Sequence, residues 1–352
     1  HVQVAVSEGG RALDGFLGLG FVDLVLAVPA TNAVAGTPKP KLSLIQIATA
    51  SGLTQESGCL QFVDRKAVEY RKERWLRAIQ QMYKHQPTAV LSWLIGASEP
   101  PEFVAQEAKR QKDCLIEAMF REAARPESPL IVDWWDRTSK KSEMSEVVRS
   151  FDRKSAYSRQ IVERITRSSH RDAITQSWIW KRKFIFRSNS FNRVSPRAAK
   201  ECALPAGRTW NPAMRSHEEC WRNKLSGPER EREILGASAA PGISRHHWGT
   251  EFDLFSLNPR NFKEGARLAD EFEWLSKKGH QFGYFQPYRA NSHEHGYMEE
   301  RWHWSYYPIG QALLEFAQSN EAPIQTALLN QWSSFETRWN RNHSRPRPFF
   351  DY

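Results

Sequence analysis

Two short stretches of the sequence gather side chains that can bind a metal ion and move a proton. In the first stretch, His246 precedes a glycine at position 249, and Asp253 follows it. In the second, Glu300 lies three residues before His303. Two imidazoles and one carboxylate leave the fourth position of a tetrahedral zinc ion open for water, as in catalytic zinc sites. Glu300, a carboxylate outside this ligand set, is then a candidate general base.

Alternating residue types around Asp253 and His303 predict two short strands that carry these side chains. In a strand over residues 250–255, Glu251 and Asp253 point to the same face. A regular strand would place Glu300 and His303 on opposite faces. We therefore expect a turn or bulge near Arg301 that brings both to one site.

The remaining histidines have weaker claims to a metal. His247 adjoins a predicted ligand, and neighbouring residues diverge, so we expect it to pack or to support the site. His293 and His295 form an alternative pair that with His303 would make a three-histidine site, although polar residues and a glycine around them favour a loop. His280 follows a glycine and is expected to be structural.

Together these motifs resemble the D-alanyl-D-alanine carboxypeptidase/dipeptidase family of zinc peptidases, of the VanY-like type. Residues 244–253, 274–284 and 300–304 carry the resemblance. The family pattern is Ser-x-His, a glycine about three residues later, an aspartate seven residues after the histidine, and a later Glu-x-Trp-His. The order and the spacing both match in this sequence, over a region of about residues 212–316.

The resemblance implies a role for each matching residue. His246, Asp253 and His303 would bind Zn²⁺, and Glu300 would be the general base. Ser244 and Trp302 would contact the substrate.

The family also uses an upstream arginine to bind the carboxylate or the carbonyl oxygen of the substrate. Arg215, in Met214-Arg215-Ser216, is the best match, and Arg208 competes for the role. The glutamine that usually follows this arginine is absent, since Glu219 and Cys220 occupy that region.

The resemblance implies an α+β fold, with a small antiparallel sheet flanked by helices and a mostly helical region before it. We divide the chain into a possible export signal and linker (1–40), a helical region of unknown role (41–190), a zinc peptidase catalytic domain (191–320), and a C-terminal helix with a basic tail (321–352).

Hydrophobic periodicity locates the main elements of the helical region. A helix is predicted from Asp64 to His85, with an apolar face that includes Trp75 and Met82, and Pro87 should end it. Further helices are predicted over residues 102–124 and 143–165. Residues 130–132 are predicted as a short strand before an acidic pair, and the alternating run 177–187 as a half-buried strand.

Charge and cysteine content limit the classes of function. The formal net charge of +10 attracts polyanions, which include nucleic acid, anionic lipid and cell-wall polymers. The four cysteines form no Cys-x-x-Cys pair, which argues against a thiolate zinc knuckle or a thioredoxin-type site. Their even number permits disulfides without requiring them.

An apolar run over residues 15–35 ends in Ala33-Val34-Ala35, a small-x-small pattern typical of signal-peptidase cleavage. This run predicts an exported protein of the periplasm or cell envelope, and the alternative is a hydrophobic element of the fold. No other segment approaches about 20 uninterrupted apolar residues, so a multi-pass membrane protein is excluded and no span is expected after processing.

The expected activity is zinc-dependent hydrolysis of a peptide bond in bacterial cell-wall peptides, with release of terminal D-alanine. Peptidoglycan stem peptides are the expected partners, and nucleic acid is not. Two alternatives stay open. One is a peptidoglycan endopeptidase that cuts the L-Ala to D-Glu or cross-bridge bond, and the other is a non-catalytic protein that binds cell wall or nucleic acid.

Overall fold

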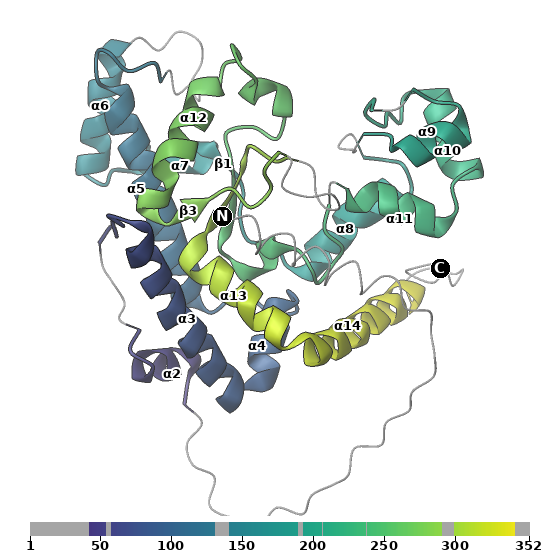
Figure 1. Ribbon diagram of the computed structural model, residues 1–352, viewed down its shortest axis with the longest axis horizontal. Coiled ribbons are helices and arrows are strands. Elements are labelled where there is room, and N and C mark those ends of the chain that lie inside the picture. Colours follow the sequence, from purple (N-terminus) through teal and green to yellow (C-terminus); the bar gives the residue numbers. More distant parts are fainter. Residues whose placement is uncertain are drawn as a thin grey trace, which may run out of the picture.

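The computed structural model describes residues 42–53, 58–130, 141–188, 193–205, 207–236, 238–290 and 299–341. Helices predominate in these residues and surround a sheet of four short strands, so the fold is α+β, as the sequence predicts (Figure 1). The signal-like run 15–35, the acidic pair after residue 130, the pair His293 and His295, and the basic tail beyond residue 341 lie outside the described residues.

The sheet is antiparallel, with its strands in the spatial order β1-β2-β4-β3. The strands are β1 (Thr166–Ser168), β2 (Glu251–Leu254), β3 (Tyr284–Phe285) and β4 (His303–Tyr306). In the central pair, Asp253 of β2 lies opposite His303 of β4, and Glu251 lies opposite Ser305. The register therefore places the two chemically active stretches of the sequence side by side.

Six helices of the described residues form the N-terminal half, and one of them, α5, covers the sheet on the face away from these side chains. They are α2 (Leu44–Ala50), α3 (Arg65–His85), α4 (Pro87–Leu94), α5 (Glu102–Ala123), α6 (Lys141–Asp152) and α7 (Ala156–Ile165). α5 contacts the sheet directly, since Tyr284 donates a hydrogen bond of 2.6 Å to the carbonyl of Ala108 and Tyr306 donates one of 2.9 Å to Glu107.

The predicted helices over residues 64–85 and 102–124 are confirmed as α3 and α5. Asp64 caps α3 by accepting a hydrogen bond of 2.8 Å from the backbone N–H of Ala67, and the helix ends at His85, before Pro87. The buried face of α3, which includes Trp75 and Met82, follows the predicted stripe.

The predicted single helix over residues 143–165 is wrong, because the chain breaks it into α6 and α7. Lys154 takes a φ of +47°, and the hydroxyl of Ser155 then accepts a hydrogen bond from Ser158 N–H to start α7. The apolar period ran through the break because Val147 of α6 and Ile161 of α7 both bury in the same core.

The predicted strand over residues 177–187 is also wrong. Residues 173–184 form the helix α8 (Ala173–Phe184), which Asp172 caps by accepting a hydrogen bond of 2.7 Å from Thr175 N–H. The aromatic residues of the run do not mark its buried positions, because Trp178 is 56% exposed while Trp180 is buried. The buried positions of α8 instead follow helical spacing.

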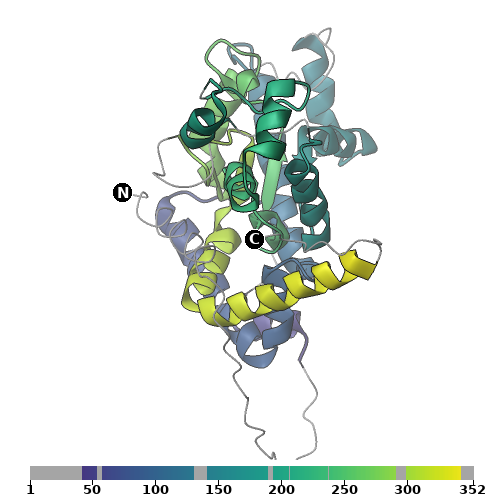
Figure 2. The same cartoon turned by 90° about the vertical axis from the view of Figure 1, so that its right-hand side faces the viewer.

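Four helices form a small lobe beside the sheet (Figures 1 and 2). They are α8, α9 (Pro196–Cys202), α10 (Arg215–Asn223) and α11 (Gly227–Leu235). The lobe has a hydrophobic core of its own, in which Trp180, Trp210 and Trp221 are buried, and a disulfide joins Cys202 to Cys220. In the chain, the lobe lies between β1 and the segment that carries His246.

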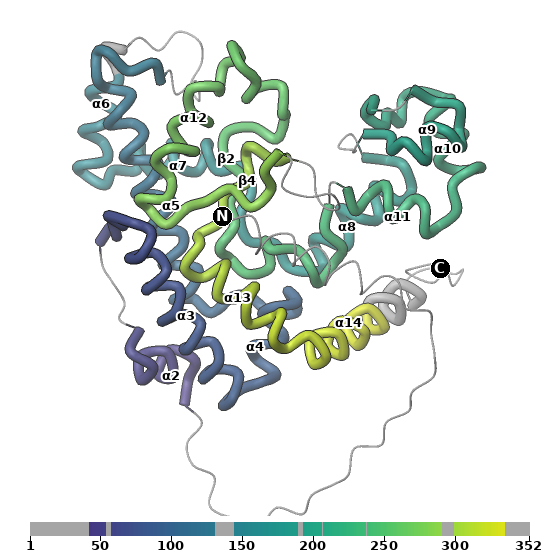
Figure 3. Tube along the Cα trace, in the orientation of Figure 1, coloured from purple at the N-terminus to yellow at the C-terminus, as the bar shows by residue number. Residues whose placement is uncertain are grey.

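The last elements close the structure around the sheet. They are the 3₁₀ helices η1 (Arg245–Trp248), η2 (Pro259–Phe262) and η3 (Gly279–Phe282), and the helices α12 (Ala269–Lys278), α13 (Tyr307–Ser319) and α14 (Glu321–Arg341). α13 packs along α3, and α14 runs on past α4 toward the small lobe (Figure 3). No helix among the described residues is long and apolar enough to cross a membrane.

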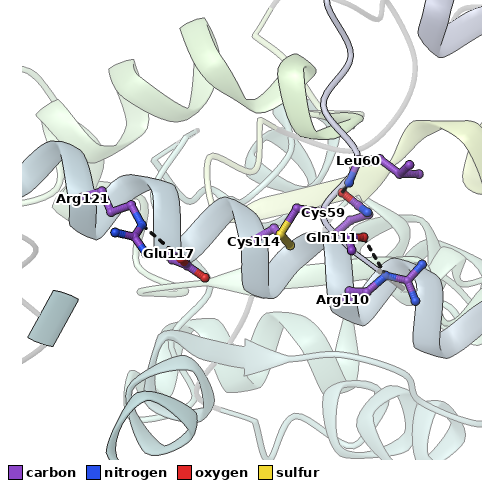
Figure 4. The surroundings of a disulfide bond; sticks show 8 residues. Cys59, Leu60, Arg110, Gln111, Cys114, Glu117 and Arg121 are labelled. Carbon is purple, nitrogen blue, oxygen red and sulfur yellow. Dashed lines mark hydrogen bonds and ion pairs between the residues drawn. A yellow bond between two sulfur atoms is a disulfide. The ribbon is translucent and has the colours of Figure 1, made fainter. Parts of the chain in front are cut away.

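The main hydrophobic core includes residues from both sides of position 190, from Ile47 in α2 to Phe316 in α13. A second disulfide, between Cys59 and Cys114, fixes the segment before α3 to the middle of α5 (Figure 4). Hydrogen bonds from Leu60 N–H to Gln111 and from Arg110 to the carbonyl of Gly58 surround it. The helical region and the sheet are therefore built on one core.

Candidate metal centre

A tight turn between η1 and β2 brings His246 toward Asp253. Gly249 ends η1 with a φ of +77°, and a Cβ at this position would lie 2.8 Å from Cγ of Pro100, so the turn requires glycine. His246 Nε2 consequently lies 3.5 Å from Asp253 Oδ2.

The turn expected near Arg301 is present and brings Glu300 to the same point. His303 N–H donates a hydrogen bond of 3.2 Å to the carbonyl of Glu300, and the chain then enters β4. His303 Nδ1 lies 3.1 Å from Asp253 Oδ1 and 3.5 Å from Glu300 Oε2. One ligand atom each from His246, Asp253 and His303 lies within 4.8 Å of the others, and all three side chains are buried.

The hydrogen bonds of the two histidines assign which ring nitrogen faces the centre. His246 Nδ1–H donates to the carbonyl of Ser169 at 2.7 Å, which leaves the Nε2 lone pair toward Asp253. His303 Nε2–H donates to Glu251 Oε2 at 2.8 Å, which leaves Nδ1 toward Asp253 and Glu300. A partner on the outer nitrogen orients the ring in this way at many metal sites.

The donor set fits a zinc ion. Asp253 Oδ1 is buried and has no hydrogen-bond partner among the described residues, although it lies 3.1 Å from His303 Nδ1. A proton on Nδ1 or a metal ion can bridge this nitrogen and this carboxylate oxygen. Two imidazole nitrogens and one carboxylate are ligands of catalytic zinc sites.

The electrostatics of the centre also favour a cation. Burial alone would raise the pKa of Asp253, but His246 and His303 outweigh it and hold the pKa well below its usual range. Burial alone would lower the pKa of His303, but the carboxylates of Asp253 and Glu251 outweigh this effect and raise the pKa to about 9. The centre therefore stabilises positive charge beside the Asp253 carboxylate.

Glu300 is placed and tuned differently from the three candidate ligands. Burial raises its pKa to about 7, and the nearby Asp253 carboxylate acts in the same direction, while His303, Arg171 and Lys183 oppose them. Its side chain keeps 19% of its surface exposed, whereas that of Asp253 keeps 7%. A carboxyl group with these properties can exchange a proton with water at neutral pH.

Arg171, which no sequence motif predicts as a site residue, is tied to the centre through its backbone. Arg171 N–H donates to the carbonyl of His246 at 3.2 Å, and its own carbonyl accepts a hydrogen bond of 2.6 Å from His247 Nδ1–H. Burial lowers the pKa of Arg171, while Asp253, Glu300 and Tyr288 act in the opposite direction. Its guanidinium makes no ion pair within the described residues, and its buried Nε lacks a hydrogen-bond partner there.

Tyr288 is a second neighbour of the centre that no sequence motif predicts. Its ring centroid lies 4.8 Å from that of His303, and its carbonyl accepts a hydrogen bond of 3.0 Å from Glu300 N–H. Neither Arg171 nor Tyr288 occurs at a spacing that marks a ligand or a base, so no sequence signal could have found them.

His247 is buried and supports η1 through both ring nitrogens. Besides the bond to Arg171, its Nε2 accepts a hydrogen bond of 3.0 Å from Gly242 N–H. Burial lowers its pKa to about 4, so the ring is neutral. A Cβ on Gly96 would lie 2.6 Å from this ring, so the loop after α4 packs directly against it.

The structure does not bring Arg215 or Arg208 to the centre. Arg215 begins α10 in the small lobe, where its side chain is 91% exposed and pairs with Glu219 at 2.7 Å. Arg208 is exposed in the same lobe. Ser244 is buried at the start of η1, and Trp302 packs its ring on Phe262, with centroids 6.4 Å apart.

Comparison with known proteins points to the same family as the sequence motifs. The family model "VanY: D-alanyl-D-alanine carboxypeptidase" matches residues 140–309. An uncharacterised protein of Haemophilus influenzae is 29% identical over 79 residues, which cover 19% of this chain and 60% of that relative. No solved structure gives a significant match. The matched segment contains β1, the small lobe, all candidate ligands and Glu300, and this match supports a VanY-like family for residues 140–309.

Proposed function

We propose that this protein is a zinc-dependent D-alanyl-D-alanine carboxypeptidase that acts on the stem peptides of bacterial peptidoglycan. The observation that supports this proposal most is the convergence of His246, Asp253 and His303 on one point, with the Glu300 carboxylate 3.5 Å from His303 Nδ1. A purely structural zinc site would need no partly exposed carboxyl group beside its ligands.

In this proposal, His246 Nε2, His303 Nδ1 and a carboxylate oxygen of Asp253 hold the metal. Zinc at this position would supply Lewis acidity, which polarises a carbonyl oxygen and acidifies water. The two outer hydrogen bonds, to Ser169 and Glu251, keep both rings oriented for this role.

Glu300 is the proposed general base and acid. Its carboxylate takes a proton from the attacking water as the oxygen of that water bonds to the scissile carbonyl carbon. It then gives the proton to the leaving amine as the C–N bond breaks. Its raised pKa suits both steps, because the group can hold and release a proton near neutral pH.

Arg171 replaces Arg215 as the proposed substrate anchor. Its charge is buried near Asp253 and Glu300 without an ion pair in the described residues. The backbone of Arg171 is fixed beside the ligands, because its N–H donates to the carbonyl of His246 and its carbonyl accepts from His247 Nδ1–H. A guanidinium held there would bind the carboxylate or the developing oxyanion of the substrate.

An exported location fits the cysteine chemistry. All four cysteines form disulfides, Cys59 with Cys114 and Cys202 with Cys220. Such bonds persist in oxidising compartments, which include the bacterial periplasm. A peptidase of cell-wall peptides would meet its substrate in that compartment.

The test combines metal analysis with product analysis. The purified full chain should contain about one zinc per molecule and release D-alanine from a peptide that ends in D-Ala-D-Ala. Glu300→Gln should bind zinc but lose about 10²- to 10⁴-fold in kcat. Full activity in that variant would overturn the mechanism, and mass analysis that found internal cleavage would point to an endopeptidase instead.

A zinc-loaded wild type that hydrolyses neither terminal nor internal bonds would overturn the enzymatic proposal and favour a binding protein. Glu299→Gln is a matched control, because Glu299 adjoins the base but its carboxylate pairs with Arg301 at 3.1 Å. Its activity should stay within about twofold of wild type.

A further inference from the structure

Glu251 is a fully buried carboxylate that touches a candidate ligand from outside the centre. Its Oε2 accepts the hydrogen bond of 2.8 Å from His303 Nε2–H, on the side of the ring opposite Asp253. Because Nε2 and Nδ1 lie on different sides of the imidazole, Glu251 cannot share the metal position with Asp253. It acts on the metal only through His303.

Three further donors hold the other oxygen of this carboxylate. Glu251 Oε1 accepts hydrogen bonds from Ser305 Oγ at 2.6 Å, Thr250 Oγ1 at 3.0 Å and Arg245 Nη2 at 3.1 Å. Arg245 also donates to Ser305 Oγ at 2.8 Å and lies over the ring of Trp248, 4.7 Å from its centroid. The carboxylate therefore has a fixed position and a fixed charge.

The surrounding backbone leaves no room for this network to move. A Cβ on Gly310 of α13 would lie 2.6 Å from Ser305 Oγ and 3.2 Å from Glu251 Oε1. Glu251 and Ser305 are also directly paired across β2 and β4. Strand pairing and helix packing thus hold the carboxylate where His303 meets it.

We infer that Glu251 is a positioning residue that sets the metal affinity of the centre, by holding His303 with its Nδ1 lone pair directed at the metal. This inference rests on the proposed function, because it assumes that His303 is a ligand. Its basis is the chain of contacts from Arg245 and Ser305 through Glu251 to His303. An anionic acceptor on the outer nitrogen also makes the inner nitrogen a better donor.

The experiment measures zinc affinity of the full chain by competition with a chromogenic chelator, without any substrate. Glu251→Gln keeps the shape of the side chain and removes its charge, and it should weaken zinc binding about 10- to 100-fold. The visible spectrum of the cobalt-substituted protein should change as well, because the geometry and donor strength at His303 change.

Glu107→Gln is the matched control. Glu107 is also buried, and it accepts hydrogen bonds from Arg71, Trp75 and Tyr306, but it touches no candidate ligand. The Glu107→Gln substitution should lower the free energy of unfolding and leave zinc affinity within about threefold of wild type. The cobalt spectrum should likewise be unchanged, so a general loss of stability cannot imitate the expected result.

The outcomes separate this inference from the proposed function. A wild type that binds no zinc overturns both. Equal zinc affinity in wild type and folded Glu251→Gln overturns the positioning role alone. If Glu251→Gln fails to fold, Gly310→Ala is the second variant, because its Cβ would contact Ser305 and Glu251. It should weaken zinc binding at least about threefold. Unchanged affinity in that folded variant overturns the inference.

Discussion

Arg171, which is half-buried with a buried Nε, and Lys183, which is buried, are two cations without a carboxylate ion-pair partner among the described residues. Arg171 lies beside the candidate ligands, and Lys183 of α8 donates its one described hydrogen bond, of 2.6 Å, to Ser238 Oγ. Both act electrostatically on the Glu300 carboxyl group. Buried charges without a partner cost stability, so such residues are candidates for function.

The two arginines considered as substrate anchors can be told apart by mutation. Arg171→Met should lower kcat/KM about 100-fold, because it removes a charged donor from the centre. Arg215→Met should leave kcat/KM within about twofold of wild type, because Arg215 is exposed and its ion pair with Glu219 contributes little to stability. Steady-state kinetics on a D-Ala-D-Ala peptide would measure both. A large loss in Arg215→Met together with normal kinetics in Arg171→Met would restore the sequence-based assignment.

Lys183 predicts a pH-dependent gain in stability on mutation. Burial lowers its pKa from 10.5 to about 8. The unfolded chain therefore binds more protons between these values, and the cost of burying the charge is fully present below about pH 8 and disappears as the pH rises to 10.5. Lys183→Met should raise the free energy of unfolding by about 1–3 kcal/mol at pH 7, after the loss of the bond to Ser238.

Urea denaturation at pH 7 and at pH 10 would measure this gain, which should shrink at the higher pH. Lys200→Met, at an exposed position of α9, is the control and should change little at either pH. A gain of equal size at both pH values would show that burial of the Lys183 charge does not lower the free energy of unfolding.

At the residue scale, sequence could identify the candidate ligands but not their surroundings. His246 and Asp253 share one turn and Glu300 and His303 another, so local spacing reports their geometry. Arg171 reaches the same point through contacts with His246 and His247, across the whole small lobe in sequence. No local pattern encodes a contact of that kind.

At the scale of elements, the central pair β2 and β4 was predictable because polar and apolar residues alternate along both strands, although every residue of the pair is buried. The run before residue 187 misled, because an exposed tryptophan and a buried lysine reverse the usual relation between residue type and burial in α8. The break between α6 and α7 depends on a single residue, Lys154, with a positive φ. Apolar period does not record such a local conformation.

The turn at Gly249 allows a test of how strictly the elements position the ligands. Gly249 and Gly265 both have positive φ values, of +77° and +71°, but only Gly249 has neighbours that a Cβ would meet. Gly265→Ala should therefore lower the free energy of unfolding by about 1 kcal/mol, through backbone strain alone. Gly249→Ala should lower the free energy of unfolding by at least about 1–3 kcal/mol more, because Pro100 must move.

Thermal denaturation would measure both losses, and zinc competition would show whether the ligands shift. Only Gly249→Ala should bind zinc more weakly, since its turn joins His246 to Asp253. Equal losses in the two variants would mean that the contact with Pro100 relaxes without cost. Normal zinc binding in Gly249→Ala would mean that the metal can pull the turn back into place.

At the scale of the whole molecule, the centre lies where three parts of the chain meet. α4 supplies Trp93, whose indole N–H donates to the carbonyl of Trp248 at 3.1 Å. α14 supplies Trp332, whose indole N–H donates to the carbonyl of Pro241 at 2.8 Å. The helical region of unknown role therefore braces η1, which carries His246, and the C-terminal helix braces the segment just before η1. The sequence could not show this, because it depends on contacts between distant segments.

The two disulfides lie in different cores, which predicts separable effects on stability. Cys59–Cys114 closes a sequence separation of 55 residues within the main core, and Cys202–Cys220 closes one of 18 residues within the small lobe. In the chain-entropy model, loss of the first should cost about 4 kcal/mol and loss of the second about 3 kcal/mol. Paired serine variants of each bridge serve as controls for one another.

Hydrogen exchange read out by mass spectrometry would locate each effect. The Cys202→Ser, Cys220→Ser variant should lose amide protection in α9, α10 and α11 and keep it in α3 and α5, where the other variant loses it. Because the ligands and Glu300 belong to the main core side of the molecule, zinc affinity should fall only when Cys59–Cys114 is removed. A uniform loss of protection in both variants would show that the small lobe and the main core unfold as one unit.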